Sequence, residues 1–460
     1  MYKIDFSSPL HIHFIGIGGI SMSGLARILQ EKGFTVSGSD SKESSITQAL
    51  EAAGIHVIYG QKAGNITPDL NLIVYTAAIH EDNPELMAAR ASGKPVMDRA
   101  SLLGQLMAQY KNSIAVAGTH GKTTTTSMLS HIFLAAKDDP TISVGGMLNA
   151  IGGNIRVGHS ENFIAEACEY TNSFLKFNPH IEVILNIDAD HLDFFKDIND
   201  IRSSFRKFAE KLGKGDLLII NSGIADLQEI TDGLACRVTT CGLEAGSDYT
   251  AENISFDEFA NGSFDLVRRG QRAGRYQLHV PGVHNISNAL AAIAVAEETD
   301  LPEDAIREGL MAFSGTDRRF QYKGTVNGVK ILDDYAHHPA EVEATLRAAH
   351  QYPHNGNIWC VFQPHTYTRT KALLPRFAEA LSLADRVVLA DIFAAREKDP
   401  GDVSSRDIQK LLEDKGTPVW YFPSFQEIEN FLSKNCINGD LLITMGAGDI
   451  VSVGEDLLKH

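Results

Sequence analysis

The sequence has 460 residues, of which 43% are hydrophobic and 22% charged, and its net charge is −17. This length exceeds what one hydrophobic core supports, so we expect three domains. The negative charge without a Lys/Arg cluster argues against a nucleic-acid partner. No apolar run approaches the ~20 residues that cross a bilayer, so no membrane insertion is expected. Five cysteines without CxxC spacing argue against disulfides or a zinc site and favour a cytoplasmic location.

The first predicted domain spans 1–112 and has a Rossmann-like pattern. A strand-like run opens HIHFIGIGGISMSGLARIL, and further runs lie at 35–40, 56–60 and 71–79, separated by helix-like stretches. The repetition of strand, turn and helix predicts a parallel sheet with crossover helices.

A glycine-rich turn follows the first strand of this domain. In GIGGISMSG, Gly16, Gly18 and Gly19 permit close backbone approach to a phosphate, and Asp40 ends the second strand, where it can accept a bond from a ribose hydroxyl. The pattern is typical of dinucleotide-dependent oxidoreductases, but Ser21 takes the place of the third fingerprint glycine. A turn of this kind also occurs for packing alone, so both interpretations stay open at this point.

The second predicted domain, 113–317, has the pattern of a P-loop-type ATPase with a mixed sheet. Its strand candidates are 162–168, 181–187 and 216–222. The stretch 249–280 alternates polar and apolar residues, which predicts antiparallel edge strands. Helices are expected at 285–299 and 302–313.

The third predicted domain, 318–460, is again a Rossmann-like α/β unit. Its strand candidates are 329–334, 358–363, 386–393 and 441–449. The whole chain is therefore predicted to be an α/β protein of three sheets.

The stretch AVAGTHGKTTTTSML, 115–129, begins as an apolar strand and continues as a helix. Between them, Gly118, Gly121, Lys122 and Thr123 offer backbone N–H groups, a cation and a hydroxyl at a helix N-terminus, which suits a nucleoside triphosphate and its metal ion. The usual P-loop has a glycine where this chain has Val116. A tight turn with a capping threonine is the structural alternative.

GTHGKTTTT resembles the ATP-binding loop of the Mur ligases, the amide-forming enzymes that assemble the peptide of bacterial cell-wall precursors. In this family the shorter GTxGKT form is the rule, so the valine is expected. The resemblance extends along almost the whole chain through HFIGIGGISMSGLA, HNISNALAA, DDYAHHPAEVEATL and FQPHTYTRT. It implies an ATP- and Mg²⁺-dependent ligase of peptidoglycan synthesis, and these segments point to UDP-N-acetylmuramate and L-alanine as its substrates.

The resemblance also implies roles for individual residues. The catalytic set is Lys122, Glu169 and His191. The ATP-binding set is Gly118, Thr119, His120, Gly121, Lys122, Thr123, Thr124, Asn285, Asn288, Arg319 and Asp334. The set for the UDP part of the substrate is Gly16, Gly18, Gly19, Ser21 and Asp40. The amino-acid set is Tyr335, His337 and Arg369, and the metal set is Thr123, Glu169 and His191.

Several of these residues also have structural interpretations. Glu169 can cap a helix, and His191 can belong to a loop network, because Mg²⁺ prefers oxygen ligands. The asparagines of HNISNALAA suit a helix start, and Tyr335 and His337 can close a core. Arg318, beside Arg319, is interpreted as a surface charge.

Two positions depart from the family pattern. Cys168 stands where these ligases often carry an aspartate, and Thr366 stands where many carry an arginine. Arg369 remains, and its fork of N–H donors suits the alanine carboxylate. The amino-acid contacts and the oligomeric state are open.

The expected reaction makes an acyl phosphate from the substrate carboxylate and ATP, after which the amine of L-alanine displaces phosphate. We expect hinge closure to bring Arg319 and Asp334 to the nucleotide. The nearer alternative is a Mur-type ligase that recycles a whole tripeptide onto the same sugar nucleotide. The remoter alternatives are an NAD-dependent dehydrogenase and an ATP-dependent scaffold without enzyme activity.

Overall fold

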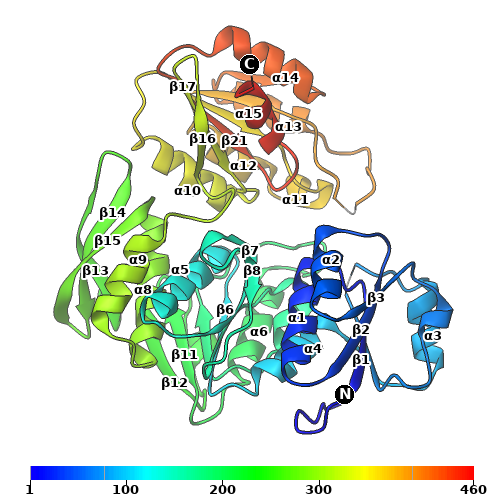
Figure 1. Ribbon diagram of the computed structural model, residues 1–460. Helices are drawn as coiled ribbons and strands as arrows, with labels where there is room; N and C mark the ends of the chain where they lie inside the picture. The colour runs from blue at the N-terminus through cyan, green and yellow to red at the C-terminus, as the bar shows by residue number, and fades with distance from the viewer. Residues whose placement is uncertain (1, 77, 396, 460) are drawn as a thin grey trace.

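The structure is a computed structural model that describes residues 2–76, 78–395 and 397–459. One residue of the predicted strand at 71–79, Ala77, lies outside these ranges. Three sheets follow one another along the chain, and helices cover their faces (Figure 1). The predicted three-part α/β fold is confirmed. Within the described ranges no helix has both the length and the apolar character needed to cross a membrane.

The N-terminal sheet has the order β3-β2-β1-β4-β5, and every neighbouring pair is parallel. Its strands are β1 (His11–Ile15), β2 (Thr35–Asp40), β3 (His56–Tyr59), β4 (Leu72–Tyr75) and β5 (Val96–Asp98). Its helices are α1 (Ile20–Glu31), α2 (Ser45–Ala52), η1 (Ala63–Asn65), α3 (Pro84–Ala91) and α4 (Arg99–Met107). Because the chain alternates strand and helix, each parallel connection crosses over through a helix, as predicted.

The central sheet is mixed and has the order β15-β14-β13-β12-β11-β10-β6-β9-β7-β8. In chain order, its first six strands are β6 (Asn112–Ala117), β7 (Thr141–Leu148), β8 (Gly153–Arg156), β9 (Asn162–Glu166), β10 (Ile181–Ile184) and β11 (Leu217–Asn221). β12 (Arg237–Cys241) extends the parallel part, and β13 (Tyr249–Phe256), β14 (Asn261–Arg268) and β15 (Gln271–Pro281) form the antiparallel edge that the sequence predicts.

Helices and short 3₁₀ segments complete the central part. They are α5 (Lys122–Ala135), η2 (Asn149–Ile151), η3 (Tyr170–Lys176), α6 (Ile198–Ala209), α7 (Gln228–Thr231), α8 (Val283–Glu298) and α9 (Glu303–Ala312). The last two agree closely with the predicted helices at 285–299 and 302–313.

The C-terminal sheet has the order β16-β17-β21-β18-β19-β20 and is parallel except for the β16–β17 pair. Its strands are β16 (Gln321–Val326), β17 (Val329–Asp334), β18 (Ile358–Phe362), β19 (Arg386–Leu389), β20 (Val419–Tyr421) and β21 (Leu441–Met445). Its helices are α10 (Pro339–Ala349), α11 (Tyr367–Ala372), α12 (Leu374–Leu381), α13 (Ser405–Asp414), α14 (Phe425–Asn435) and α15 (Val451–Leu457).

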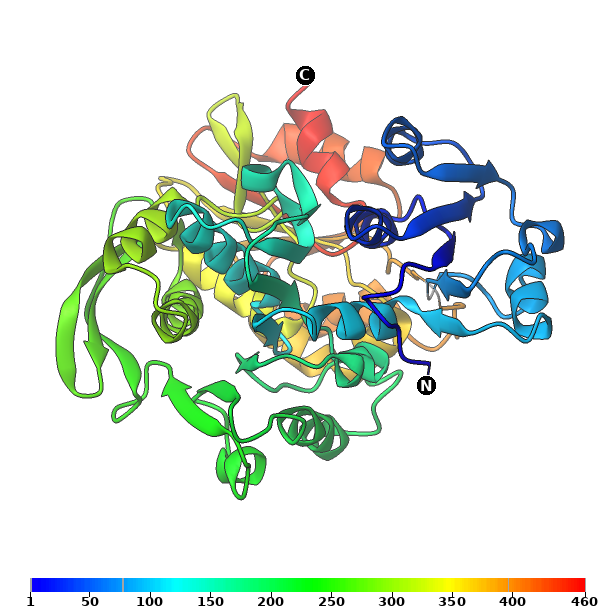
Figure 2. The ribbon, with the colours of Figure 1, turned by 60° about the horizontal axis from the view of Figure 1, so that its bottom comes forward.

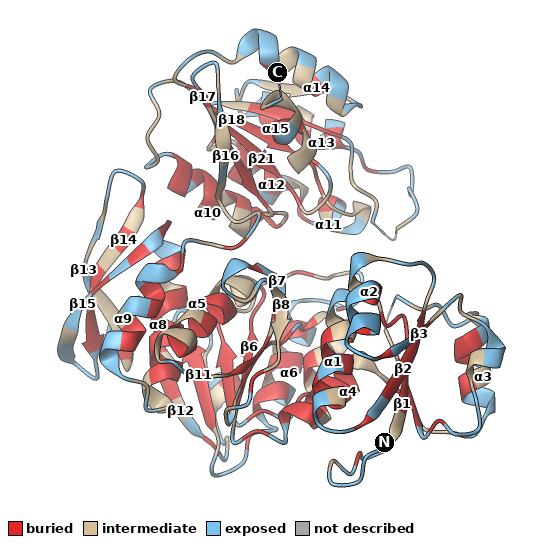
Figure 3. Cartoon of the chain, in the orientation of Figure 1, coloured by how far each residue is buried: buried red, intermediate tan, exposed pale blue. Residues whose placement is uncertain are grey.

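Strand β6 shows how the central sheet is held. Ala115 and Ala117 belong to the core on one face, whereas Ile114 and Val116 belong to the core on the other, and all four are fully buried. Figure 3 shows the same pattern of buried strands inside each of the three units. A strand covered on both faces is continuously apolar, which is why the sequence predicts it well.

The N-terminal and central parts pack closely against each other at two glycines, where a side chain would not fit. A Cβ on Gly104 of α4 would lie 2.0 Å from the carbonyl oxygen of Lys176, and a Cβ on Gly24 of α1 would lie 2.3 Å from Ile155. The C-terminal part lies over the carboxyl edge of the central sheet (Figures 1 and 2). The carboxyl ends of β6, β9 and β10 therefore lie between the parts of the chain.

Candidate active site

The loop between β6 and α5 has the backbone of an anion-binding turn. Gly118 and Gly121 have φ angles of 143° and 79°, in a region that residues with a side chain avoid. A Cβ on Gly121 would lie 2.6 Å from the side-chain oxygen of Asn288. Val116 lies inside β6 and is fully buried, so the loop begins after the position where a longer P-loop carries its glycine.

Lys122 begins α5 and points back into the loop. Its Nζ donates to the carbonyl oxygen of Thr119 at 3.0 Å and lies 3.0 Å from Oε2 of Glu169. Burial alone disfavours the charged ammonium, but the neighbouring Glu169 outweighs burial and raises the pKa of Lys122. The ammonium is therefore a fixed positive charge at the N-terminus of α5, where the helix dipole also favours an anion.

Two carboxylates face this loop from the end of β9. The Thr123 hydroxyl donates to Oε2 of Glu166 at 2.9 Å, and the backbone N–H of Gly145 donates to the same oxygen at 2.7 Å. Glu169 is buried behind Lys122. In the described part of the chain, no three His, Cys, Asp or Glu side chains form a ready cage for a metal. A hydroxyl and one or two carboxylates suit Mg²⁺, which takes its remaining ligands from phosphate and water.

The loop after β10 supports the glycine loop and brings His191 to it. The side-chain oxygen of Asn186 accepts from the backbone N–H of His120 at 2.7 Å, and Thr119 bonds the backbone of Asp188. His191 has φ of 52°, and its Nε2 lies 3.8 Å from Oε1 of Glu169. The structure thus brings His191, Glu169 and Lys122 together.

Arg369 enters from α11 of the C-terminal part and is almost fully buried. Its Nε donates to Oδ1 of Asp190 at 2.8 Å, and its Nη1 lies 3.0 Å from Nδ1 of His365. Burial alone would raise the pKa of the Asp190 carboxyl, but Arg369 holds it well below its usual range. Arg369 therefore joins the two parts of the chain here, directly beside His191.

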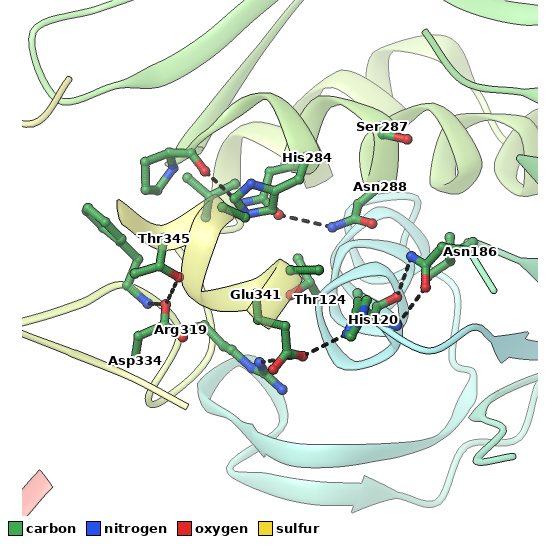
Figure 4. Close-up of a pocket in the computed structure, with 18 of the residues that line it drawn as sticks. His120, Thr124, Asn186, His284, Ser287, Asn288, Arg319, Asp334, Glu341 and Thr345 are labelled. Atoms are coloured by element: carbon green, nitrogen blue, oxygen red, sulfur yellow. Dashed lines mark hydrogen bonds and ion pairs between the residues drawn. The ribbon is translucent and has the colours of Figure 1, made fainter. Parts of the chain in front are cut away.

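A cavity of about 270 Å³ lies between the glycine loop, α8 and α10. Asn285 and Asn288 line it and are bonded to each other, with Asn288 Nδ2 donating to Asn285 Oδ1 at 3.1 Å. Thr124 also lines it, and Figure 4 shows Thr124 and Asn288 around the same space. Apolar contacts come from Leu185, Val280, Pro281 and Phe313. An apolar space with a few fixed polar groups is the usual form of a small-molecule or cofactor site.

Asp334, at the end of β17, lies at the far wall of this cavity. Its oxygens accept from the backbone N–H groups of Phe320 and Ala336 and from the Thr345 hydroxyl. Burial raises the pKa of the Asp334 carboxyl to about 6, although nearby Arg319 opposes this shift. Asp334 thus lines the same cavity as the two asparagines.

A second cavity, of about 620 Å³, lies beside the glycine loop and the start of α5. Lys122, Thr123, Glu166 and His191 line it from the central part, and Tyr335 and His337 line it from the C-terminal part. Its wall also includes Asp190, the partner of Arg369. Residues of the predicted ATP, metal and amino-acid sets therefore meet at the interface between the central and C-terminal parts. Arg369 does not line the second cavity itself, but its ion-pair partner Asp190 does.

The two neighbouring arginines of GTDRRF have different surroundings. Arg319 lines both cavities and lies with its guanidinium 5.3 Å from the ring centre of Tyr335. Arg318 pairs with the buried carboxylate of Asp333 at 2.9 Å and donates to the carbonyls of Gly446 and Gly448. Interpreting Arg318 as a surface charge was therefore wrong, because it fastens β17 to the loop after β21.

The set predicted for the UDP part lies apart from these cavities, in the N-terminal sheet. Gly16 has φ of 82°, and the backbone N–H of Gly18 donates to Oδ2 of Asp40 at 2.8 Å. Ser21, in the first turn of α1, accepts from Nη1 of Arg99 at 3.0 Å. Neither cavity includes Gly16, Gly18, Gly19, Ser21 or Asp40 in its lining.

Sequence reasoning missed several residues at this interface. They include Glu166, Asn186, Asp188, His284 and Glu341. For Asn186 and Asp188 a signal existed, because NIDAD follows a strand of the parallel sheet. For Glu341 the local sequence indicates only a helix N-terminus. Its contact with His120 joins residues 221 positions apart, and such a contact leaves no local pattern.

Three family profiles match consecutive parts of the chain. They are the Mur ligase family, catalytic domain, over residues 11–111; the Mur ligase middle domain, over 116–296; and the Mur ligase, glutamate ligase domain, over 318–448.

Curated relatives and a solved structure match over nearly the whole length. A UDP-N-acetylmuramate--L-alanine ligase of Agathobacter rectalis is 63% identical over 100% of both chains, and one of Lachnospira eligens is 58% identical, also over 100% of both. The crystal structure of a UDP-N-acetylmuramate-alanine ligase from Thermotoga maritima is 29% identical, with a TM-score of 0.78 over 98% of each chain.

Proposed function

This chain belongs to the Mur ligase family, and we propose from that premise that it uses ATP to join L-alanine to the lactyl carboxylate of UDP-N-acetylmuramate. The names of relatives up to 63% identical over the full length support these two substrates. The observation that carries the proposal is the Lys122–Glu169 pair at the start of α5, in a cleft shared with the C-terminal part.

We assign each predicted residue set to the part of a substrate that it binds. Asn285, Asn288 and Asp334 hold the nucleoside, and Gly118, Thr119, His120, Gly121, Lys122, Thr123, Thr124 and Arg319 hold the phosphates. Gly16, Gly18, Gly19, Ser21 and Asp40 hold the UDP part, and Tyr335, His337 and Arg369 hold L-alanine. The domain ranges 1–112, 113–317 and 318–460 remain part of this proposal.

The chemistry follows from the poor reactivity of a carboxylate. One oxygen of the lactyl carboxylate attacks the γ-phosphorus of ATP, the bond to the β-phosphate oxygen breaks, and ADP leaves. The neutral amine of L-alanine then attacks the acyl phosphate, the carbon–oxygen bond to phosphate breaks, and the nitrogen loses a proton. Lys122 offsets negative charge that develops on the phosphate in both steps.

The metal assignment is also a proposal. Thr123, Glu169 and His191 are the residues that would hold Mg²⁺. The Thr123 hydroxyl and the Glu169 carboxylate are oxygen ligands of the kind Mg²⁺ prefers, and Nε2 of His191 lies 3.8 Å from Oε1 of Glu169. When bound, Mg²⁺ supplies additional positive charge against phosphate oxygens. A cytoplasmic location belongs to the same proposal, because the five cysteines are free thiols.

The amino acid distinguishes this function from the tripeptide-recycling alternative. The experiment measures phosphate release from ATP with UDP-N-acetylmuramate and either L-alanine or the free tripeptide. We expect turnover with L-alanine and only background with the tripeptide. Turnover with the tripeptide alone would reject the proposed function.

A further inference from the structure

Glu341 lies in the first turn of α10 and bonds in two directions. Its Oε2 accepts from the backbone N–H groups of His337 and His338, at 3.1 and 3.3 Å, and so caps its own helix. Its Oε1 reaches the central part, where it lies 3.2 Å from Nδ1 of His120. The same oxygen lies 3.9 Å from Nη1 of Arg319. One carboxylate thus joins the glycine loop to the C-terminal part.

The charges in this cluster are complementary. His120 is held between Asp188, at 3.2 Å from its Nε2, and Glu341. Burial alone would lower the pKa of His120, but the carboxylates of Asp188 and Glu341 raise it to about 9, so the ring is a cation at neutral pH. Burial would raise the pKa of Glu341, but His337, His120 and Arg319 hold it well below its usual range. Glu341 is therefore an anion clasped by cations.

The cluster of Glu341, His120 and Arg319 lies between the two cavities. His120, Gly121, Arg319 and Glu341 line both the nucleoside cavity and the cavity that contains Lys122. Figure 4 shows Glu341 between His120 and Arg319, at the side of the loop. A nucleoside triphosphate that extends from the first cavity to Lys122 passes these four residues. Its phosphates bring negative charge to the place where Glu341 already holds the cations.

We propose that Glu341 stands in for phosphate in the nucleotide-free enzyme, holding His120 and Arg319, and that the triphosphate of ATP takes over these two cations when it binds. The inference rests on the proposed function, because it takes ATP as the nucleotide. Glu341 is a positioning residue in this scheme, since it acts through His120 and Arg319. The exchange also couples the nucleotide to the C-terminal part, because Glu341 is carried by α10.

A purely supporting role for Glu341 makes the opposite prediction. If the carboxylate only orients His120 and Arg319 toward phosphate, then neutralising it weakens nucleotide binding. If it competes with phosphate, neutralising it frees two cations and strengthens binding. Glutamine keeps an oxygen that can cap α10, so Glu341→Gln separates the effect of charge from the effect of the cap.

The experiment is calorimetric titration of the full chain with the non-hydrolysable analogue AMP-PNP and MgCl₂, and separately with adenosine. For Glu341→Gln we expect the Kd of AMP-PNP to fall by about fivefold, a modest change because water screens a partly exposed cluster, while the Kd of adenosine stays unchanged. The matched control is Glu343→Gln on the same helix, whose exposed carboxylate pairs with Arg347, and we expect wild-type affinities.

Weaker or unchanged AMP-PNP binding in Glu341→Gln would overturn the inference, as would an equal gain for adenosine. Thermal melting of each variant checks folding, and Glu341→Ala gives the same comparison if the glutamine variant does not fold. Because these titrations contain no amino acid, they can succeed or fail independently of wild-type turnover with L-alanine, which tests the proposed function itself.

Discussion

At the scale of single residues, the guanidinium of Arg369 pairs with a protein carboxylate and is also proposed to bind a substrate carboxylate. We propose that it binds the carboxylate of L-alanine, yet its Nε is engaged by Asp190 at 2.8 Å, with both side chains less than one-tenth exposed. One planar fork can serve both partners, because Nε and the terminal nitrogens point in different directions. The structural and substrate roles can therefore be separated by changing the partner.

We expect Arg369→Ala to lower the free energy of unfolding by about 3 kcal/mol, because Asp190 is left as a buried unpaired charge. Adding Asp190→Asn should recover most of this loss in urea unfolding. The KM for L-alanine should stay raised by about tenfold or more in the double variant, since the carboxylate has still lost its donors. Recovery of both stability and KM would show that Arg369 does not bind the amino acid.

At the scale of elements, strand β10 contains a carboxylate that its sheet does not satisfy. Glu182 is fully buried, and neither side-chain oxygen has a hydrogen-bond partner among the described residues. Burial raises the pKa of Glu182 well above its ordinary value of 4.5, although Lys211 opposes the shift. The folded protein then binds more protons than the unfolded chain above pH 4.5, so this group lowers stability as pH rises toward its folded-state pKa.

We expect Glu182→Gln to be more stable than the wild type at neutral pH. The difference in the free energy of unfolding should be small near pH 4.5 and then grow by up to about 1.4 kcal/mol per pH unit until the folded-state pKa is reached. Urea unfolding at several pH values measures it. Glu161→Gln, at an exposed site, is the control and should show no such growth. A constant difference across pH would contradict the assignment.

The elements also show where sequence reasoning succeeds. The strands buried on both faces, such as β6 and β10, are mostly apolar and were predicted within a few residues, although β10 includes the buried Glu182. Strand β7 was not predicted, because the adjacent glycines Gly145 and Gly146 interrupt its apolar pattern. A Cβ on Gly145 would lie 2.5 Å from the Glu166 carboxylate. Glu341 was missed for a different reason, since a contact between distant segments leaves no local pattern in the sequence.

At the scale of the whole molecule, the N-terminal and central parts differ from the C-terminal part in how they are joined. Gly104 permits backbone contact between the first two, and Gly24 permits close packing of α1 on the Ile155 side chain, whereas the cluster of His120, Glu341 and Arg369 joins the third through charges. The His120–Glu341 pair is partly hydrated, and such pairs exchange partners more easily than packed backbones separate. We therefore expect closure to move the C-terminal part.

The close packing at α4 can be tested directly. Gly104→Ala should lower the free energy of unfolding by about 1–3 kcal/mol, because its Cβ would meet the Lys176 carbonyl at 2.0 Å and the backbone must shift. The matched control is Gly215→Ala, where an added Cβ meets nothing within 4 Å. Urea unfolding compares both variants with the wild type. An alanine at 104 that left stability unchanged would mean that the two parts are not in rigid contact.

The measurement that tests the account most directly follows the substrate oxygen. UDP-N-acetylmuramate labelled with ¹⁸O in its lactyl carboxylate is converted with ATP and L-alanine, and the released phosphate is analysed by mass spectrometry. Activation beside Lys122 as an acyl phosphate predicts one ¹⁸O atom in each phosphate, because the carbon–oxygen bond breaks in the second step. Phosphate that carries no label would contradict the proposed role of this site.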